Sequence, residues 1–265
     1  MKIVIVLPCY NEEAILEKNI KQVAEAVKNL PHDIKIVISD NNSKDRTAEI
    51  GKRLAQELPS VNYMFVGEPG KGAAVMEAWK NFSDFDVYGF MDADLAMDLE
   101  ALPRALEYFT PSSILPLDPP SASPLPPDYR GKKGEEGGGY DVVIGSRRIK
   151  GAEAKRELYR KFISAGLSFL IKLFLKTKIK DTPCGFKFFR KAVLDKVLPQ
   201  VKDRQWVFDT ELLILAERSE YSIKEMPVKW AEKNERGSKV NIYPTAMEYL
   251  KKIWEIRKRI NNVVE

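Results

Sequence analysis

The first 109 residues alternate short hydrophobic runs with longer segments of helical periodicity. The runs show little alternation of polar and apolar positions, which is typical of strands buried on both faces of a parallel sheet. Their order predicts an open, doubly wound α/β domain with a mostly parallel sheet flanked by helices. The predicted strands lie at 2–7, 34–39, 61–66 and 86–91, and the helices at 12–30, from an N-cap at Ser43, at 71–81 and at 98–109.

This rhythm breaks at residues 110–139. Seven of these 30 residues are proline and five are glycine, which predicts a flexible insertion or surface loop. A strand pattern resumes at 140–146 and precedes a long basic amphipathic helix at 153–175. Pro244 opens a last amphipathic helix within residues 244–265. The elements predicted in between are a strand at 186–189, helices at 190–198 and 209–218, and a strand at 222–228.

The composition argues against several classes of protein. The chain has 265 residues, 44% hydrophobic and 31% charged, which fits a large globular domain and neither a disordered nor a polytopic membrane chain. Its two cysteines are Cys9 and Cys184, and its single histidine is His32. A disulfide scaffold, a cysteine-rich zinc module and a histidine-built metal site are therefore not expected.

The net charge of +5 conceals an asymmetry along the chain. Residues 1–139 carry 15 Lys and Arg against 22 Asp and Glu, whereas residues 140–265 carry 28 against 16. A basic C-terminal half indicates phosphate-bearing ligands, nucleic acid or an anionic membrane surface.

The hydrophobic runs are too short to cross a membrane. The longest, at 162–175, has 14 residues and is interrupted by Lys172, whereas a spanning helix needs ~20. The run at 3–7 is too short for a signal-peptide core. We therefore expect a cytoplasmic protein that associates peripherally with a membrane through the helix at 153–175, unless that helix packs on the sheet. Its apolar face holds Leu158, Phe162, Phe169, Leu170, Leu173 and Phe174.

Polar residues follow three of the predicted strands, at 8–13, 39–43 and 91–94. Ligands of open α/β sheets bind beyond the carboxyl ends of the strands, so these segments are expected to share one site. Each segment alone is explained by turns and helix caps. Asp92 and Asp94 place two carboxylates at this edge, and such oxygen ligands suit Mg²⁺ or Mn²⁺ bridging a diphosphate.

Gly70, Lys71 and Gly72 open the helix after the third strand. The glycines allow a backbone to approach an anion closely, and Lys71 can reach a phosphate. The segment is not a P-loop, because no Gly-Lys-Ser or Gly-Lys-Thr occurs at the required spacing. A Gly-x-Gly-x-x-Gly motif is also missing after the first strand, which argues against dinucleotide binding.

The chain holds, in this order, the motifs Pro8-x-Tyr10-Asn11-Glu12, Asp40-Asn-Asn-Ser43-x-Asp45-x-Thr47, Gly70-Lys71-Gly72, Asp92-Ala-Asp94, Gly145-Ser146-Arg147, Asp181-Thr-Pro-Cys-Gly185-Phe186-Lys187, Trp206-x-Phe208-Asp209-x-Glu211 and Gly237-Ser238-Lys239-Val240. This order resembles family 2 glycosyltransferases of the GT-A fold. The later motifs are similar to the branch of dolichyl-phosphate glucosyltransferases and dolichyl-phosphate mannose synthases, with a preference for the glucosyl members. The resemblance covers about residues 2–258, apart from the insertion.

The resemblance implies a single domain over 1–258, with a nucleotide-binding half at 1–109 and an acceptor-side half at 140–243. The amphipathic helix at 244–265 follows the acceptor-side half in the sequence. It assigns nucleotide-sugar contacts to Pro8, Tyr10, Asn11, Glu12, Asp40, Lys71 and Asp92. It assigns the metal, Mg²⁺ or Mn²⁺, to Asp92 and Asp94. The chain departs from the usual Asp-Asp-Gly-Ser of the family at Asn41 and Asn42, and an asparagine at 42 can replace a glycine at positive φ.

The second half is expected to bind the acceptor. Arg147, Arg148 and Lys187 lie on turns predicted to face the crevice, where a prenyl phosphate needs cations, although charged residues are also common on any solvated surface. The candidates for a catalytic role are Asp94, Arg147 and Asp209. Asp209 and Glu211 open a helix, so stabilisation of the helix dipole is their simplest explanation. A phosphate acceptor is largely ionised at neutral pH and needs no strong base.

The sequence therefore predicts an inverting glycosyltransferase that moves a hexose, glucose in preference to mannose, from UDP-glucose or GDP-mannose to a polyprenyl phosphate of the dolichyl type. The inversion is implied by the resemblance. A membrane surface is an expected partner, and nucleic acid is not. Three alternatives stay open: transfer to a polysaccharide or lipid hydroxyl, nucleotidyl transfer, and a non-catalytic protein that binds nucleotide sugars at a membrane surface.

Overall fold

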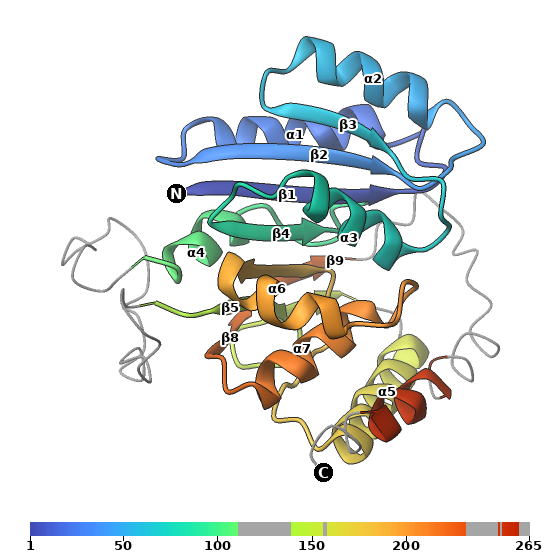
Figure 1. The fold of residues 1–265 in the computed structure, drawn as a ribbon, viewed down its shortest axis with the longest axis vertical. Helices are drawn as coiled ribbons and strands as arrows, with labels where there is room; N and C mark the ends of the chain where they lie inside the picture. Colours follow the sequence, from blue (N-terminus) through green and yellow to red (C-terminus); the bar gives the residue numbers. More distant parts are fainter. Residues whose placement is uncertain (111–138, 156–157, 232–248, 250, 260–265) are drawn as a thin grey trace.

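A seven-stranded sheet with helices on both faces forms the centre of the computed structural model (Figure 1). The structure describes residues 1–110, 139–155, 158–231, 249 and 251–259. The predicted insertion, apart from its first and last residues, lies outside the described residues, as do Gly237–Val240.

The described elements follow the predicted order, with two short strands and a short 3₁₀ helix added. The strands are β1 Lys2–Cys9, β2 Asp33–Asp40, β3 Val61–Phe65, β4 Val87–Met91, β5 Val142–Ser146, β6 Glu153–Lys155, β7 Phe186–Arg190, β8 Ile223–Pro227 and β9 Lys229–Ala231. The helices are α1 Leu16–Lys28, α2 Thr47–Glu57, α3 Lys71–Asn81, α4 Ala101–Glu107, α5 Leu158–Leu175, α6 Lys191–Val197, the short 3₁₀ helix η2 Leu198–Gln200 and α7 Phe208–Arg218. Residues 251–259 form a further helix, here called the C-terminal helix.

The main sheet has the order β3-β2-β1-β4-β7-β5-β8. Its pairs are parallel except for those made by β7, which runs antiparallel to both β4 and β5. Residues Ile3–Leu7 of β1 have no exposed surface, which explains why this strand lacks an alternating pattern. One core packs α1, α2 and α4 on one face, and a second packs α3, α6 and α7 on the other. The predicted α/β class is confirmed.

Two local predictions are wrong. The helix predicted from an N-cap at Ser43 begins at Thr47, because the hydroxyl of Ser43 accepts the amide of Asn11 (3.0 Å) from the neighbouring loop. The long helix predicted at 153–175 begins at Leu158. Residues 153–155 instead pair in parallel with β9, a strand that the sequence pattern did not indicate.

Helix α5 packs against the C-terminal helix and α7 (Figure 1). A third apolar cluster joins Ile171 and Leu175 of α5 to Ile253 and Ile256 of the C-terminal helix and to Ile214 of α7. On the other side of α5, Phe169 is 65% exposed and Leu173 is also exposed. No helix among the described residues has the length and apolar character required to span a bilayer.

Candidate active site

The three polar segments that follow strands meet at one edge of the sheet. Cys9 at the end of β1 pairs with Asp40 at the end of β2, and β4 lies parallel on the other side of β1. The loops that carry Tyr10, Asp40 and Asp92 therefore start side by side, as the sequence predicted.

Asn11 joins the first two loops. It has a positive φ of 55°, its amide donates to Ser43, and its side-chain oxygen accepts the amide of Lys44 (2.7 Å). The next amide, that of Glu12, donates to the hydroxyl of Thr47 (2.7 Å). Pro8 lies within β1, and the ring of Tyr10 beside Asn11 is exposed. The loops are thus fixed to each other, with an aromatic ring at their surface.

Asp40 is buried beneath these loops. Its carboxylate accepts the amide of Ser43 (3.0 Å) and the hydroxyl of Tyr63 (2.8 Å). Burial and this hydrogen bond raise the pKa of Tyr63. Asp40 therefore shapes the loop that follows β2 as well as lying where a contact with the nucleotide sugar was expected.

The two asparagines that depart from the family pattern have separate structural reasons. The side-chain nitrogen of Asn41 donates to the carbonyl of Glu68 (2.6 Å), and its oxygen accepts the amide of Gly70 (2.6 Å). An ionised aspartate could accept but not donate, so this bridge requires an amide side chain. Asn42 has a φ of 60°, which confirms the predicted positive φ at this position.

Lys71 and Asp92 form the ion pair at the centre of the site, with 2.5 Å between Nζ and Oδ1. The Lys71 side chain is only 13% exposed. Burial acts to lower the pKa of Lys71, but the charges of Asp92 and Asp209 outweigh it and raise this pKa overall. Lys71 therefore stays protonated and neutralises the carboxylate at the sheet edge. Asp94 lies two residues on, and its carboxylate accepts the amide of Ala96 (3.0 Å).

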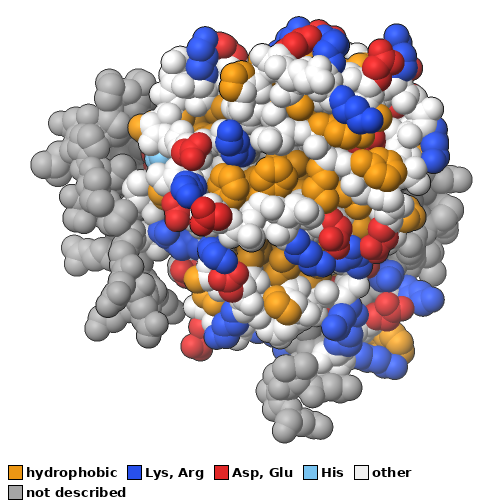
Figure 2. Space-filling model, turned by 45° about the horizontal axis from the view of Figure 1, so that its top comes forward, with side chains coloured by type: hydrophobic (Ala, Val, Ile, Leu, Met, Phe, Trp, Pro, Cys, Tyr) orange, Lys and Arg blue, Asp and Glu red, His pale blue; other side chains and the backbone are white. Residues whose placement is uncertain are grey.

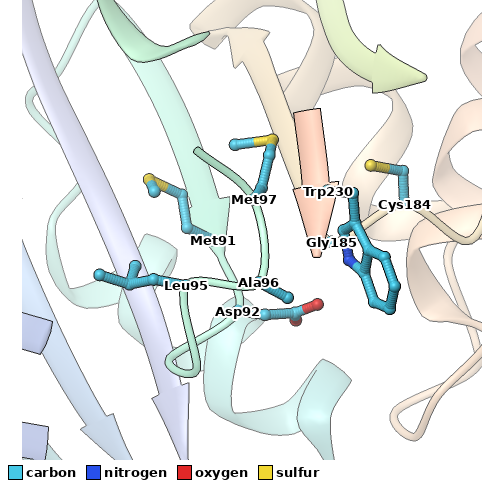
Figure 3. A pocket seen from close by; sticks show the side chains of 8 residues that line it. All are labelled: Met91, Asp92, Leu95, Ala96, Met97, Cys184, Gly185 and Trp230. Atoms are coloured by element: carbon cyan, nitrogen blue, oxygen red, sulfur yellow. The ribbon is translucent and has the colours of Figure 1, made fainter. Parts of the chain in front are cut away.

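Gly185 leaves the room that Asp92 occupies. A Cβ atom at this position would lie 1.8 Å from Oδ2 of Asp92, and the Asp92 amide donates to the Gly185 carbonyl (3.1 Å). Figure 3 shows the Asp92 carboxylate pointing into a small pocket that Trp230 and Cys184 also line. Trp230 was not singled out from the sequence, because it lies in a three-residue strand with no periodic pattern around it.

The glycines on either side of Lys71 serve a different purpose from the predicted one. The amides of Gly72 and Ala73 donate to the carbonyls of Gln205 (2.9 Å) and Arg204 (2.8 Å). A Cβ on Gly70 would lie 2.3 Å from the carbonyl oxygen of Arg204, and one on Gly72 would lie 2.7 Å from its carbonyl carbon. The glycines thus admit another stretch of this chain, and these two helix-terminal amides are not open to an anion.

A second ion pair joins Lys187 to Asp209 beneath the first. Lys187 has no exposed surface and also donates to the carbonyl of Cys184 (2.6 Å). The Lys71 and Lys187 ammonium groups lie 5.2 and 5.3 Å from the ring centroid of Phe90. The expected contact of Lys187 with an acceptor phosphate is therefore corrected, because its charge is enclosed and paired with Asp209.

Arg147 and Arg148 share Asp181. The guanidinium of Arg147 binds its carboxylate through two hydrogen bonds of 2.7 Å, and Nε of Arg148 lies 3.8 Å from it. Burial acts to lower the pKa of Arg147, but the hydrogen bonds to Asp181 raise it overall. The guanidinium of Arg147 also lies 5.9 Å from the ring centroid of Trp230, beside the pocket that holds Asp92. The two arginines are thus brought together close to the site.

The chain is similar to known sugar transferases. The model of the family "Glycosyl transferase family 2" matches residues 4–113. The dolichyl-phosphate beta-glucosyltransferase ALG5A of Trichomonas vaginalis is 30% identical over 249 residues, which cover 90% of this chain and 68% of that protein. The chain belongs to glycosyltransferase family 2.

Two other similar proteins are also named as sugar transferases. The dolichol-phosphate mannosyltransferase of Pyrococcus furiosus is 28% identical, over 97% of this chain and 64% of that protein. Glycosyltransferase AglD of Haloferax volcanii is also 28% identical, over 89% of this chain, but the chain spans only 34% of its length.

The solved structures show the GT-A fold. Glucosyl-3-phosphoglycerate synthase of Mycobacterium tuberculosis, in complex with Mn²⁺, UDP and phosphoglyceric acid, is 14% identical with a TM-score of 0.64. The match covers 97% of this chain and 78% of that one.

The carboxylates of the site fit a divalent cation whose coordination is completed by a bound phosphate ligand. Among the described residues there is no cluster of three or more His, Cys, Asp or Glu side chains able to bind a metal. Mg²⁺ is commonly held by one or two carboxylates, completed by phosphate oxygens and water. Asp92 and Asp94 provide that number of carboxylates at the sheet edge.

We predict that Gly72→Ala lowers the free energy of unfolding by about 1–3 kcal/mol, the usual cost of overpacking. The added methyl group would press on the backbone of Arg204, which cannot move aside as a side-chain end can. Urea unfolding measures the effect, with Gly166→Ala as the control because a Cβ there meets nothing within 4 Å. If Gly72→Ala keeps full stability and loses only anion binding, the glycines serve a ligand after all.

Proposed function

We propose that the chain is an inverting, metal-dependent hexosyltransferase that moves glucose, in preference to mannose, from a nucleotide diphosphate sugar to a polyprenyl phosphate of the dolichyl type. The observation that carries this proposal is the Lys71–Asp92 ion pair, beside Asp94 at the carboxyl edge of a family 2 sheet. The relative ALG5A, named for glucosyl transfer to dolichyl phosphate, supports the choice of glucose.

The donor is assigned to the loops after β1, β2 and β4. Tyr10 offers an exposed ring for the base or ribose, and the loop that Asn11 and Asp40 hold together would enclose the nucleoside. Pro8 and Glu12 complete this side of the site as nucleotide contacts. Asp92 and Asp94 would hold Mg²⁺ or Mn²⁺, which would neutralise diphosphate charge when bound.

Lys71 neutralises Asp92 in the free protein and is placed to neutralise diphosphate charge once a donor binds. An ammonium group that stays protonated strengthens the binding of a donor diphosphate through charge-assisted hydrogen bonds. The carboxylate of Asp209, which pairs with Lys187, contributes to keeping Lys71 protonated. We therefore assign Asp209 an electrostatic role rather than that of a base.

The acceptor phosphate is assigned to Arg147 and Arg148. Asp181 binds the Nε–Nη2 edge of Arg147 and so fixes its guanidinium, and a phosphate would bind at the other edge, formed by Nη1 and Nη2. Because a phosphate monoester is already largely ionised near pH 7, this site has to position an anion and needs no strong base. An acceptor hydroxyl would require a base, so a phosphate fits this arrangement better.

The membrane surface is assigned to α5 and the C-terminal helix. Phe169 and Leu173 of α5 and Trp254 of the C-terminal helix are exposed, and the Lys258 ammonium lies over the Trp254 ring. Figure 2 shows Lys and Arg side chains gathered at its lower right, the part of the view in which these helices lie. Exposed apolar groups flanked by cations favour docking to an anionic bilayer, which would bring the site to a lipid acceptor.

The function is tested with UDP-glucose, GDP-mannose and UDP-GlcNAc, each combined with a short prenyl phosphate and Mg²⁺ or Mn²⁺. We expect glucosyl prenyl phosphate as the main product, no turnover in EDTA, and a loss of roughly two orders of magnitude or more in kcat for Asp94→Asn. Full activity in EDTA would remove the metal role. Transfer to a prenyl alcohol but not to the phosphate would favour the hydroxyl-acceptor alternative.

Membrane docking is tested by flotation of the full chain with anionic vesicles. Each cation near such a surface contributes about 1 kcal/mol, so binding should fall as salt rises. We expect Phe169→Ser with Leu173→Ser to weaken binding by about tenfold or more, because two exposed apolar side chains are lost. Phe65→Ser removes an exposed ring on β3 and should leave binding unchanged. If wild-type protein does not float at low salt, the assignment of this surface is wrong.

A further inference from the structure

Residues 202–207, which connect η2 to α7, lie over the start of α3. Their carbonyls accept the amides of Gly72 and Ala73, and the side chain of Gln205 donates to the carbonyl of Pro69 (2.8 Å). Arg204 pairs with Glu68 at 2.6 Å and with Glu77 at 2.7 Å. This segment therefore fixes the backbone on both sides of Lys71.

Trp206 extends the contact to the Lys71 side chain itself. Its ring centroid lies 5.9 Å from the ammonium nitrogen of Lys71, although the ring is 60% exposed. An exposed ring keeps such a position only if the backbone that carries it is held elsewhere. The groups that hold segment 202–207 consequently determine where Trp206 and Lys71 lie.

Glu211 holds the segment from below. One oxygen of its carboxylate accepts the amides of Lys202 (3.1 Å) and Asp203 (2.8 Å). Asp203 in turn accepts the amides of Gln205 (2.9 Å) and Val207 (3.1 Å). Glu211 is buried, and burial raises the pKa of its carboxyl group. A buried carboxylate with these contacts is placed to order a backbone, not to meet a substrate.

The C-terminal helix reaches the other oxygen of Glu211. The guanidinium of Arg259 donates to it at 2.7 Å, and Lys252 lies 3.4 Å from the carboxylate of Asp203. The hydroxyl groups of Tyr249 and Thr210 lie 3.1 Å apart in the same interface. A helix that is distant in sequence thus contacts both carboxylates that order segment 202–207.

We infer that Glu211 is a positioning residue through which the C-terminal helix holds segment 202–207 over α3 and so sets the position of Lys71 for the donor. This inference rests on the proposed function only in its last step, where Lys71 meets a diphosphate. It predicts that changes at the C-terminal helix alter donor binding, although that helix lies on the side assigned to the membrane.

The first test needs no ligand. Glu211 uses one carboxylate oxygen for the amides of Lys202 and Asp203 and the other for Arg259. A glutamine has a single acceptor oxygen, so its NH₂ group would face the N–H donors on one of these two sides. We expect Glu211→Gln to speed hydrogen exchange at Gly72 and Ala73 by about tenfold, since charge-assisted hydrogen bonds to buried groups are lost. Arg259→Gln should act in the same direction. Lys251→Gln removes an exposed charge of the same helix and is the control.

The second test measures steady-state kinetics with UDP-glucose and GDP-mannose. For the preferred donor, we expect Glu211→Gln to raise KM by about tenfold with kcat within about twofold, as for an interaction that supports binding alone. The double variant Glu211→Gln/Arg259→Gln should lose no more than Glu211→Gln, because Arg259 acts through Glu211. A purely structural role would lower stability without this separation of KM from kcat.

The outcomes separate the two proposals. If wild-type protein binds neither donor but exchange at Gly72 and Ala73 speeds up in both variants, the proposed function fails and the positioning of α3 stands. If the donor binds and both variants match Lys251→Gln in exchange and in KM, the inference is overturned. Arg259→Gln changes a partly exposed side chain, so exchange and KM can still be measured with this variant if Glu211→Gln does not fold.

Discussion

The negative charge of Asp92 at the open edge of the sheet is the constraint on which this site depends. Two features from distant parts of the chain allow this carboxylate to lie there. The ammonium group of Lys71 neutralises its charge, and the absence of a side chain at Gly185 leaves room for it. The antiparallel pairing of β7 with β4 brings Gly185 to that place. The site thus depends on β7, the strand that runs antiparallel to both of its neighbours in the main sheet.

The ion pair at Asp92 lies next to a second ion pair in the core. Phe90 lies beneath both ammonium groups, so the Lys71–Asp92 pair stands next to the enclosed Lys187–Asp209 pair. Removing one partner of a buried ion pair such as Lys187–Asp209 costs about 3–5 kcal/mol, so the core beneath the site is sensitive to single changes. The same start of α3 is fixed from outside by Arg204 and Gln205. The position of Lys71 is therefore set by Asp92, by the ring of Phe90 and by segment 202–207, so the residue that we propose to meet the donor is also part of the packing.

Sequence patterns predicted the features that depend on neighbours in the chain. The buried run of β1 and the carboxylates at the end of β4 follow from the local pattern of apolar and polar residues. The positive φ of Asn42 was expected because the related family has a glycine at this position, which asparagine can replace. The roles of Asn41, Gly72 and Lys187 could not be found this way, because each depends on a partner that only folding brings close. For the same reason a three-residue pairing with β9 replaced the first turns of a predicted helix.

In the free protein, the ammonium group of Lys71 neutralises Asp92, so a divalent cation that bound this carboxylate would compete with Lys71 for it. Electron paramagnetic resonance of free Mn²⁺ measures metal binding to Lys71→Met and to wild-type protein without any nucleotide. Removing a cation in direct contact with the carboxylate should strengthen Mn²⁺ binding by about tenfold. Lys80→Met, which removes an exposed lysine at the other end of α3, should change nothing. Unchanged or weaker Mn²⁺ binding in Lys71→Met would contradict the account.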